Sequence, residues 1–393
     1  MSLLLALLLV IIFAERMFKH LLVALFFRRH IPFPTQPVTR VSILQPILSG
    51  DPTMAAGLEQ NLTMETVYPL EFLWLVDEDD TEAQNICKNL LRRYPDKRAH
   101  LILLPPPGTR QNPKMMKLIA GADKATGDVL CILDDDTRLP DYGLEICLPF
   151  LDQPGVGLAF GLPYYVSFEN FWSQLVAYFV NSYSLMNYIP YSMLTEPVTI
   201  NGMFYAIRRE VLEEVGGFDG LENILADDFA IAKRMRDRGY RLIQTPLRHA
   251  ISTWVATPRN YFSLMQRWFI FPRESIMRHL SGRDQLIFYS TGLVPVFFPW
   301  IALLVAILDP ALWPVLLLYF LYSYLIFAHF NLAYLKRASP WSYSHLVTLI
   351  SLLLPAQILS ALFARQRINW RGHIMQAEPG GNFQFVRRRS KRG

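Results

Sequence analysis

The stretch LCILDDDTRLP, from Leu130 to Pro140, carries the clearest signal for the fold. An apolar, strand-like run leads directly into three consecutive aspartates, Asp134, Asp135 and Asp136. Three adjacent carboxylates repel one another, so a fold that keeps them is expected to give them a cationic partner. Alternation along a strand would turn Asp134 and Asp136 to one side and Asp135 to the other. The pattern predicts a strand that ends at a cation-binding edge.

The segment from about Thr39 to Pro258 alternates strand-like and helical runs around this stretch. Strand-like runs are 41–48, 70–80, 98–108 and 155–166, and helical runs are 57–67, 81–94 and 114–126. Such alternation predicts an α/β fold with a mostly parallel sheet and crossover helices. Ligands of these sheets bind at the carboxyl ends of the strands. Because 77–80 and 134–136 both follow strands, we expect the two acidic clusters to face one crevice.

Both ends of the chain are apolar. Hydrophobic residues make up 52% of the sequence and charged residues 18%, against about 25% charged in a soluble domain. The runs 286–308, 310–335 and 341–364 each approach the ~20 residues that cross a bilayer. The predicted organisation is an amino-terminal membrane anchor (1–30), a catalytic domain (39–284), carboxyl-terminal membrane helices (285–364) and a basic tail (365–393).

The orientation of these segments stays open. The anchor lacks the basic start and cleavage site of a signal peptide, so we expect it to be uncleaved, with its closing Arg28, Arg29 and His30 cytosolic. Four crossings would put both ends on the non-cytosolic face, whereas the arginine-rich tail favours the cytosol. A re-entrant last segment, broken at Pro355, would reconcile the two. The aromatic run 168–193 fits either an interfacial helix or a core helix.

Composition excludes some classes of partner. The net charge of +5 fits a surface that lies on anionic lipid and a site for an anionic substrate. No basic run is interleaved with aromatic residues in the manner of a nucleic-acid site. Cys87, Cys131 and Cys147 lack metal-binding spacing, so we expect them to be reduced and buried. Only the last dozen or so residues have the composition of a disordered segment.

Three groups of residues carry the chemistry. Asp134 and Asp136 provide hard oxygen ligands for one divalent ion, with room left for substrate phosphates. Asp227 and Asp228 begin a predicted helix, where the helix dipole favours acids, or one of them acts as a general base.

The third group lies just before the carboxyl-terminal apolar runs. Arg267 and Trp268, with Arg259 and Arg273 nearby, offer guanidinium groups for a diphosphate and an aromatic face for a sugar or base. An interfacial tryptophan flanked by positive-inside arginines explains the same residues.

Taken together, the sequence resembles the ceramide glucosyltransferases, membrane-bound inverting glycosyltransferases with a GT-A fold. The similarity extends over nearly the whole chain. It includes QPILSGDP (45–52), ICKNLLRRYP (86–95), NPKMMKL (112–118), VGLAFGLPY (156–164), NGMFYAIRREVLEEVGGF (201–218), ADDFAIAKRMRDRGYR (226–241), MQRW (265–268) and INWRG (368–372).

The resemblance implies roles for the donor side of the site. Asp77, with Asp79, would lie near the uridine of a UDP-sugar. Lys114 would also contact the donor. Asp134 and Asp136 would bind Mn²⁺ or Mg²⁺ and through it the diphosphate, with Asp134 counted among the donor-binding residues.

It also implies roles for the catalytic and acceptor side. Asp228 matches the catalytic acid of the family, and Asp227 stands at a position usually filled by Glu. Arg267 and Trp268 match the end of the family's QxxRW-type motif and would bind the donor. Leu264 departs from the Gln or Arg expected at the start of that motif. This chain has a full DxD motif, formed by Asp134 and Asp136. The ceramide enzymes of the family often lack it, so in this respect the chain is closer to the wider glycosyltransferase pattern.

The implied reaction is transfer of a hexose, with glucose expected, from a UDP-sugar to the primary hydroxyl of a membrane lipid, with ceramide expected, and with inversion. Related enzymes that use UDP-N-acetylglucosamine or UDP-glucose and a hopanoid or diacylglycerol acceptor carry nearly the same motifs. Other classes are a polysaccharide synthase, which needs a longer membrane bundle, and a non-enzymatic lipid-binding protein. The implied location is an integral membrane protein with a cytosolic catalytic domain, in the inner or plasma membrane of a bacterium or a Golgi-type membrane of a eukaryote.

Overall fold

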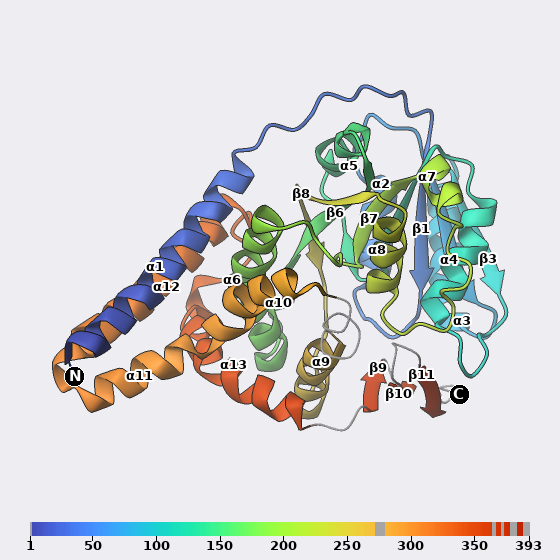
Figure 1. Ribbon diagram of the computed structural model, residues 1–393. Helices are drawn as coiled ribbons and strands as arrows, with labels where there is room; N and C mark the ends of the chain where they lie inside the picture. Colours follow the sequence, from blue (N-terminus) through green and yellow to red (C-terminus); the bar gives the residue numbers. More distant parts are fainter. Residues whose placement is uncertain (1, 272–279, 364–366, 371–372, 378–382, 388–393) are drawn as a thin grey trace.

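The computed structural model describes residues 2–271, 280–363, 367–370, 373–377 and 383–387. An eight-stranded sheet with helices on both faces adjoins a set of long helices, and a three-stranded sheet lies near the carboxyl end (Figure 1). Arg273, Arg371, Gly372 and the closing basic residues 388–393 of the predicted tail lie outside the described residues.

The large sheet has the strand order β3-β2-β1-β4-β7-β6-β8-β5. Its strands are β1 (Val41–Ile47), β2 (Leu70–Asp77), β3 (Ala99–Leu104), β4 (Val129–Leu133), β5 (Thr137–Arg138), β6 (Val156–Tyr165), β7 (Phe204–Arg208) and β8 (Arg241–Ile251). Pairs β1–β2, β1–β4, β2–β3 and β6–β8 are parallel, whereas β7 runs antiparallel between β4 and β6, and β5 pairs antiparallel with β8. The expected α/β class with a mostly parallel sheet is confirmed.

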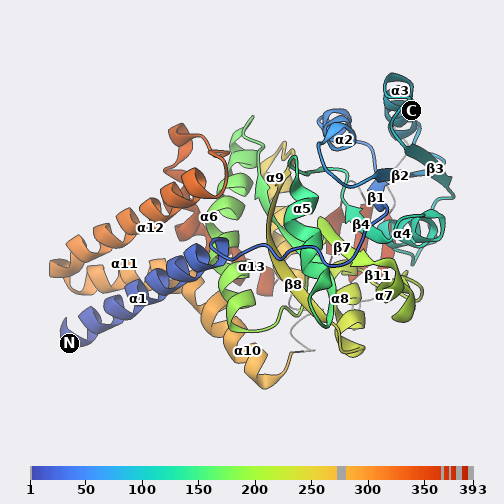
Figure 2. The ribbon, with the colours of Figure 1, turned by 90° about the horizontal axis from the view of Figure 1, so that it is seen from above.

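Helices cover both faces of this sheet (Figure 2). On one face α2 (Met54–Thr63), α3 (Thr81–Arg93) and α5 (Gly143–Cys147), followed by a short 3₁₀ turn (Leu148–Asp152), bury apolar side chains against β1, β2 and β4. On the other face α4 (Pro113–Lys124), α7 (Arg209–Glu214) and α8 (Asp227–Asp237) do the same. The sheet is therefore buried on both faces, which explains why its parallel strands read as continuous apolar runs.

The predicted element boundaries differ in several places; the strand expected at 98–108, for example, ends at Leu104. The helix expected at 57–67 begins at Met54 and ends at Thr63. The strand expected at 70–80 ends at Asp77, because Asp80 caps α3 by accepting a hydrogen bond from the backbone N–H of Ala83. The strand before the three aspartates ends at Leu133, so Asp134–Asp136 form a turn.

Long helices form the second part of the molecule. They are α1 (Ser2–Phe27), α6 (Phe171–Leu194), α9 (Pro258–Phe271), α10 (Gly282–Phe288), α11 (Phe298–Leu308), α12 (Trp313–Ala333) and α13 (Leu346–Leu362). Within the described residues, two continuous helical stretches, Gly282–Leu308 and Pro310–Ala333, are long and apolar enough to cross a membrane. Helix α13 continues through Pro355, so the break predicted there is wrong. At 1.5 Å per residue its 17 residues span about 26 Å, short of the ~30 Å hydrocarbon layer.

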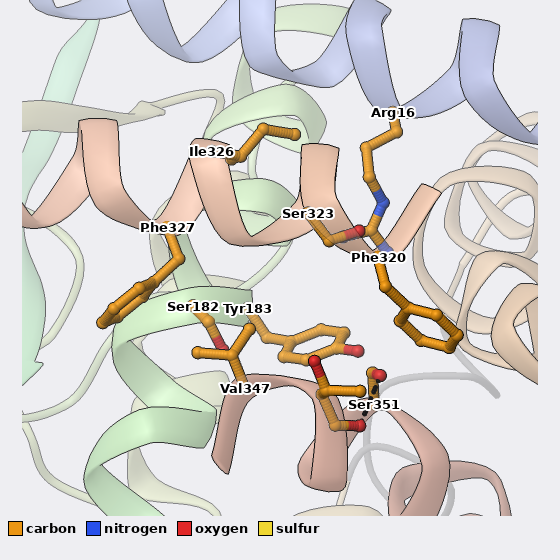
Figure 3. A pocket seen from close by; sticks show the side chains of 10 residues that line it. Arg16, Ser182, Tyr183, Phe320, Ser323, Ile326, Phe327, Val347 and Ser351 are labelled. Carbon is orange, nitrogen blue, oxygen red and sulfur yellow. Dashed lines mark hydrogen bonds between the residues drawn. The ribbon is translucent and has the colours of Figure 1, made fainter. Parts of the chain in front are cut away.

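Helix α1 docks on α12 through its polar residues. The Arg16 guanidinium donates to the Tyr319 hydroxyl at 2.9 Å, and the rings of His20 and His329 are joined by a 2.8 Å hydrogen bond between Nε2 and Nδ1. Figure 3 shows Arg16 reaching into a small cavity between α1, α6, α12 and α13. Charged side chains in membrane segments are expected to face such partners. The polar interruption of the predicted anchor is thus a helix–helix contact.

Helix α6 joins the sheet to the long helices. It packs on β6 and against α1, α9, α12 and α13, and its buried residues lie on all sides. Inside it, Asn181 is fully buried: its amide accepts from the backbone N–H of Tyr165 at 2.8 Å and donates to that residue's carbonyl and to the Ser339 hydroxyl, both at 2.9 Å. This arrangement favours the core-helix alternative for 168–193.

Replacing Asn181 is expected to loosen this joint. In Asn181→Leu, the buried N–H and C=O of Tyr165 both lose their partner, which should lower the free energy of unfolding by about 2–6 kcal/mol at about 1–3 kcal/mol for each group. Thermal unfolding of the protein in detergent measures the change. The matched control is Ser182→Ala, since that hydroxyl donates to carbonyls of its own helix, those of Tyr178 and Phe179. Equal melting temperatures for the two variants would contradict the role assigned to Asn181.

Candidate active site

A cavity of about 1200 Å³ opens at the carboxyl ends of the parallel strands. Its walls are the loop after β1 (46–52), the start of α4, the aspartate turn, residues 202–203 and 225–228, the loop after β8 (251–256), α9 and Arg387. Parallel sheets bind ligands at this edge. The volume exceeds the ~300–1,000 Å³ typical of the site of one small ligand.

The three aspartates have different partners. Lys114 Nζ lies 2.8 Å from Asp134 Oδ1, whereas the buried carboxylate of Asp135 accepts from the backbone N–H of Leu48 at 2.8 Å. Asp136 lines the cavity, and its Oδ1 accepts from the Thr137 hydroxyl at 3.3 Å. Asp135 lines the same cavity as Asp134 and Asp136, so the expectation that it points to the opposite side is not borne out. The three residues form a turn closed by a hydrogen bond from the Thr137 N–H to the Asp134 carbonyl, not a pleated strand.

Lys114 is the cationic partner that the acidic stretch requires. Its Nζ lies 2.8 Å from Asp134 Oδ1 and 3.2 Å from Asp227 Oδ2, and it donates to the Gly202 carbonyl at 2.9 Å. Burial by itself would lower the pKa of Lys114, but the two carboxylates raise it well above its ordinary value. The group therefore stays an ammonium ion.

Asp228 lies half-buried at the start of α8, and like its neighbour Asp227 it lines the cavity. Burial and the neighbouring charge of Asp227 raise the pKa of Asp228 to about 7, and burial raises that of Asp134 to about 6 although Lys114 opposes the shift. A Cβ atom on Gly202 would lie 3.0 Å from the Cβ of Asp228, so the glycine permits this approach. A carboxylate whose pKa lies near neutrality suits a general base.

The structure does not bring the first acidic cluster into the cavity. Asp77 is buried and paired with Lys117 Nζ at 2.9 Å, and it is Lys117 that lines the cavity. Burial raises the pKa of Asp77, and Lys117 counteracts the shift. Asp79 is exposed outside the cavity, and Asp80 accepts from the Ser49 N–H. The expectation that both clusters face one crevice is wrong. In the first cluster, Asp77 pairs with Lys117 and Asp80 caps α3.

Helix α9 brings Arg267 and Trp268 to the cavity. The Trp268 ring stacks on Phe179 at 6.0 Å between centroids and meets Tyr165 edge-on at 6.1 Å. Leu264 lines the cavity and packs in the same apolar cluster, which explains an apolar residue at this position. Arg259 does not line the cavity.

Two of the four basic residues that line the cavity, Lys117 and Arg387, were not predicted. Lys117 follows Lys114 by three residues in the first turns of α4, so both share one helix face. Cations there oppose the helix dipole, which is a sequence signal for nearby anions. No comparable feature of the sequence indicated that Arg387 would lie at the site.

Arg387 reaches the cavity from the tail. The strands β9 (Arg367–Trp370), β10 (His373–Ala377) and β11 (Phe383–Arg387) form an antiparallel sheet. Its Phe385 N–H donates to the Thr109 carbonyl at 3.1 Å, and the buried Phe383 packs in a cluster with Leu225. Residues 383–387 are therefore ordered, contrary to the expectation of disorder.

The cavity residues fit a divalent cation only in part. Within the described residues, no three His, Cys, Asp or Glu side chains are placed as a metal site. Asp134 and Asp136 both line the cavity, however, together with four further aspartates and four basic residues. A diphosphate would meet this net negative wall, so a cation beside it is electrostatically favoured. Two carboxylates suit an ion that completes its shell with substrate oxygens and water.

The sequence profile of Glycosyl transferase family 21 matches residues 3–383. Two relatives from Caenorhabditis elegans are ceramide glucosyltransferase 1, 24% identical over 275 residues, and ceramide glucosyltransferase 3, 24% identical over 208 residues. The matches cover 68% and 51% of this chain and 56% and 43% of those proteins, so this chain spans about half the length of these curated relatives.

Similar solved structures are glycosyltransferases. The mannosyltransferase PcManGT of Pyrobaculum calidifontis, in complex with GDP-Man and Mn²⁺, is 18% identical with a TM-score of 0.49, covering 90% of this chain and 98% of its own. GalNAc-T7 with UDP, GalNAc and Mn²⁺ is 13% identical with a TM-score of 0.43, covering 62% and 50%.

The buried pair of Asp77 and Lys117 should behave as a unit in stability measurements. Lys117→Met leaves the Asp77 carboxylate buried and unpaired, so we expect the free energy of unfolding to fall by about 3–5 kcal/mol. Asp77→Asn combined with Lys117→Met removes the orphaned charge and should recover most of the loss. Thermal unfolding in detergent measures both variants.

A control for this pair lies on the same helix. Lys124→Met removes an exposed lysine from the end of α4 and should change stability by less than about 0.5 kcal/mol. A double variant no more stable than Lys117→Met would show that the lysine contributes by packing and not by pairing.

Proposed function

The chain belongs to glycosyl transferase family 21, and from this premise we propose that it transfers a hexose from a UDP-sugar to the primary hydroxyl of a membrane lipid. Glucose is the proposed sugar and ceramide the proposed acceptor. The observation that carries the proposal is that Lys114 contacts both Asp134, in the aspartate turn, and Asp227, which directly precedes Asp228 in the chain. These residues line one cavity, which is large enough for both substrates.

The donor side is proposed to bind the nucleotide sugar by its diphosphate. Asp134 and Asp136 would hold Mn²⁺ or Mg²⁺, which, when bound, offsets the charge that builds on the departing diphosphate. Arg267 from α9 adds a guanidinium group suited to phosphate oxygens. Asp77 would act on the donor only through Lys117, and Asp79, exposed outside the cavity, would contact it only at the mouth of the site.

The acceptor side is proposed to centre on Asp228. Its carboxylate takes the proton from the lipid hydroxyl as the oxygen attacks the anomeric carbon. The new carbon–oxygen bond forms as the bond to the diphosphate breaks, and UDP leaves with the bonding electrons. One in-line displacement inverts the anomeric centre. Lys114 holds Asp227, the neighbouring carboxylate, away from this reaction.

The lipid is proposed to approach from the side of the long helices. Trp254 and Phe262 are large apolar side chains that are 47% and 56% exposed, on the loop after β8 and on α9. Trp254 lines the cavity, so apolar surface continues from the site to the outside. Exposed aromatic groups at this position suit a membrane interface. The catalytic domain would then stand at the cytosolic surface, where nucleotide sugars are found.

The purified chain tests the proposal directly. We expect UDP-glucose, and not UDP-galactose or UDP-N-acetylglucosamine, to yield a hexosyl lipid with ceramide, identified by product mass against parallel reactions with diacylglycerol and a hopanoid. Asp228→Asn and Asp136→Asn should each lower kcat by about 10²–10⁴-fold.

Asp135→Asn is the matched control for these variants, because an amide oxygen still accepts from Leu48 N–H. It should cause a mild loss of activity. A product with another donor or acceptor would correct the proposed substrates. No product from any pair, or full turnover in both Asp228→Asn and Asp136→Asn, would contradict the transferase mechanism.

The pH dependence of kcat/KM should report the raised pKa of Asp228. The base must be ionised to accept a proton, so activity should be lost as pH falls below about 7, by about tenfold per pH unit at the acidic limit. Initial rates at low donor concentration measure this. The residual activity of Asp228→Asn should be flat over the same range, and an identical acidic limb in that variant would assign the ionisation to another group.

A further inference from the structure

Lys114 Nζ lies at a site made of three oxygens from three parts of the chain. They are Asp134 Oδ1 at 2.8 Å, the Gly202 carbonyl at 2.9 Å and Asp227 Oδ2 at 3.2 Å. An ammonium group has three protons to donate, and Lys114 pairs with Asp134, donates to the Gly202 carbonyl and lies within ion-pair distance of Asp227. Carboxylate and carbonyl oxygens are also the ligands of hard divalent cations. The lysine therefore holds a position that suits a metal ion.

We propose that Lys114 is a built-in cation that competes with the divalent ion for Asp134 and is displaced toward Asp227 when ion and donor bind. The inference deepens the proposed function and rests on it, because it takes Asp134 as a ligand of the ion. Lys114 is thus a positioning residue that links the donor site to the start of α8, where Asp228 lies.

Electrostatics requires this exchange. An ammonium ion and a divalent cation repel each other strongly at contact distance, so both cannot lie against the same carboxylate oxygen. Before the ion binds, however, the cluster of aspartates needs a counter-charge to stay compact. A lysine meets both needs, since its charge is fixed to the chain and its stem is flexible.

The surroundings of Lys114 allow the ammonium group to move without the helix. Asn112 caps α4 by accepting from the N–H groups of Lys114 and Met115, and Met115 and Leu118 are fully buried. The backbone of residue 114 is therefore fixed. Asp227 Oδ2 has no hydrogen-bond partner of good geometry and lies only 3.2 Å from Nζ, so it can receive the displaced ammonium.

Direct binding of Mn²⁺ to the purified chain, without nucleotide sugar, tests the proposal. Free Mn²⁺ is followed by electron paramagnetic resonance. Lys114→Met and Lys114→Gln both remove the competing charge, and the glutamine retains a hydrogen-bond donor if the methionine variant fails to fold. Each should bind Mn²⁺ about tenfold more tightly than the unaltered chain.

Three further variants serve as controls. Lys114→Arg keeps the competing cation and should bind Mn²⁺ as the unaltered chain does. Lys124→Met removes the same charge from the exposed end of α4 and should change nothing. Asp134→Asn, added to Lys114→Gln, should abolish the gain in affinity.

Unchanged or weaker Mn²⁺ binding in both Lys114→Met and Lys114→Gln overturns the proposal. The product assay separates this result from failure of the proposed function. Lipid glycosylation by the unaltered chain, with unchanged Mn²⁺ affinity in the two variants, overturns the role of Lys114 alone. Absence of glycosylation with every donor and acceptor overturns the proposed function, whatever the Mn²⁺ measurement gives.

Discussion

The contact of one lysine with carboxylates from two segments is the constraint on which the rest of the site depends. Asp134 follows a central strand of the sheet, and Asp227 begins a helix almost a hundred residues later, so their charges would repel in the absence of Lys114. The position of Lys114 is fixed in turn by the Asn112 cap of α4. The capping and packing of α4 therefore also determine where the charged residues of the site meet.

Local patterns were enough to predict the framework. Short apolar runs located the strands β1, β2, β3, β4 and β6, because chains buried on both faces of a sheet show uninterrupted hydrophobicity. The strands β5, β7 and β8 were not predicted. That β7 runs antiparallel to its neighbours could not be predicted either, since direction in a sheet follows from the connections between strands and not from composition. The aspartate turn and the start of α8 were located for the same local reason.

Contacts between distant segments were beyond the reach of these patterns. Asp77 resembles a donor ligand in sequence, but its pairing with Lys117 is decided by the approach of α4 to β2. Arg387 enters the cavity only because Phe383 and Phe385 dock the tail beside Leu225 and Thr109. Both depend on packing partners far away in the chain, which no single window of sequence contains.

The docking of α1 on α12 has a consequence for biosynthesis. The Arg16 side chain meets Tyr319, a partner 303 positions later in the chain. At about 5–20 residues per second, a ribosome needs roughly 15–60 s to supply that partner. During this interval Arg16 would lie in lipid without its partner on α12, whereas Lys19 is paired with Glu15 within α1 itself. For a helix that is expected from the sequence to lie in the bilayer, Arg16 therefore acquires this partner only during synthesis of the last third of the protein.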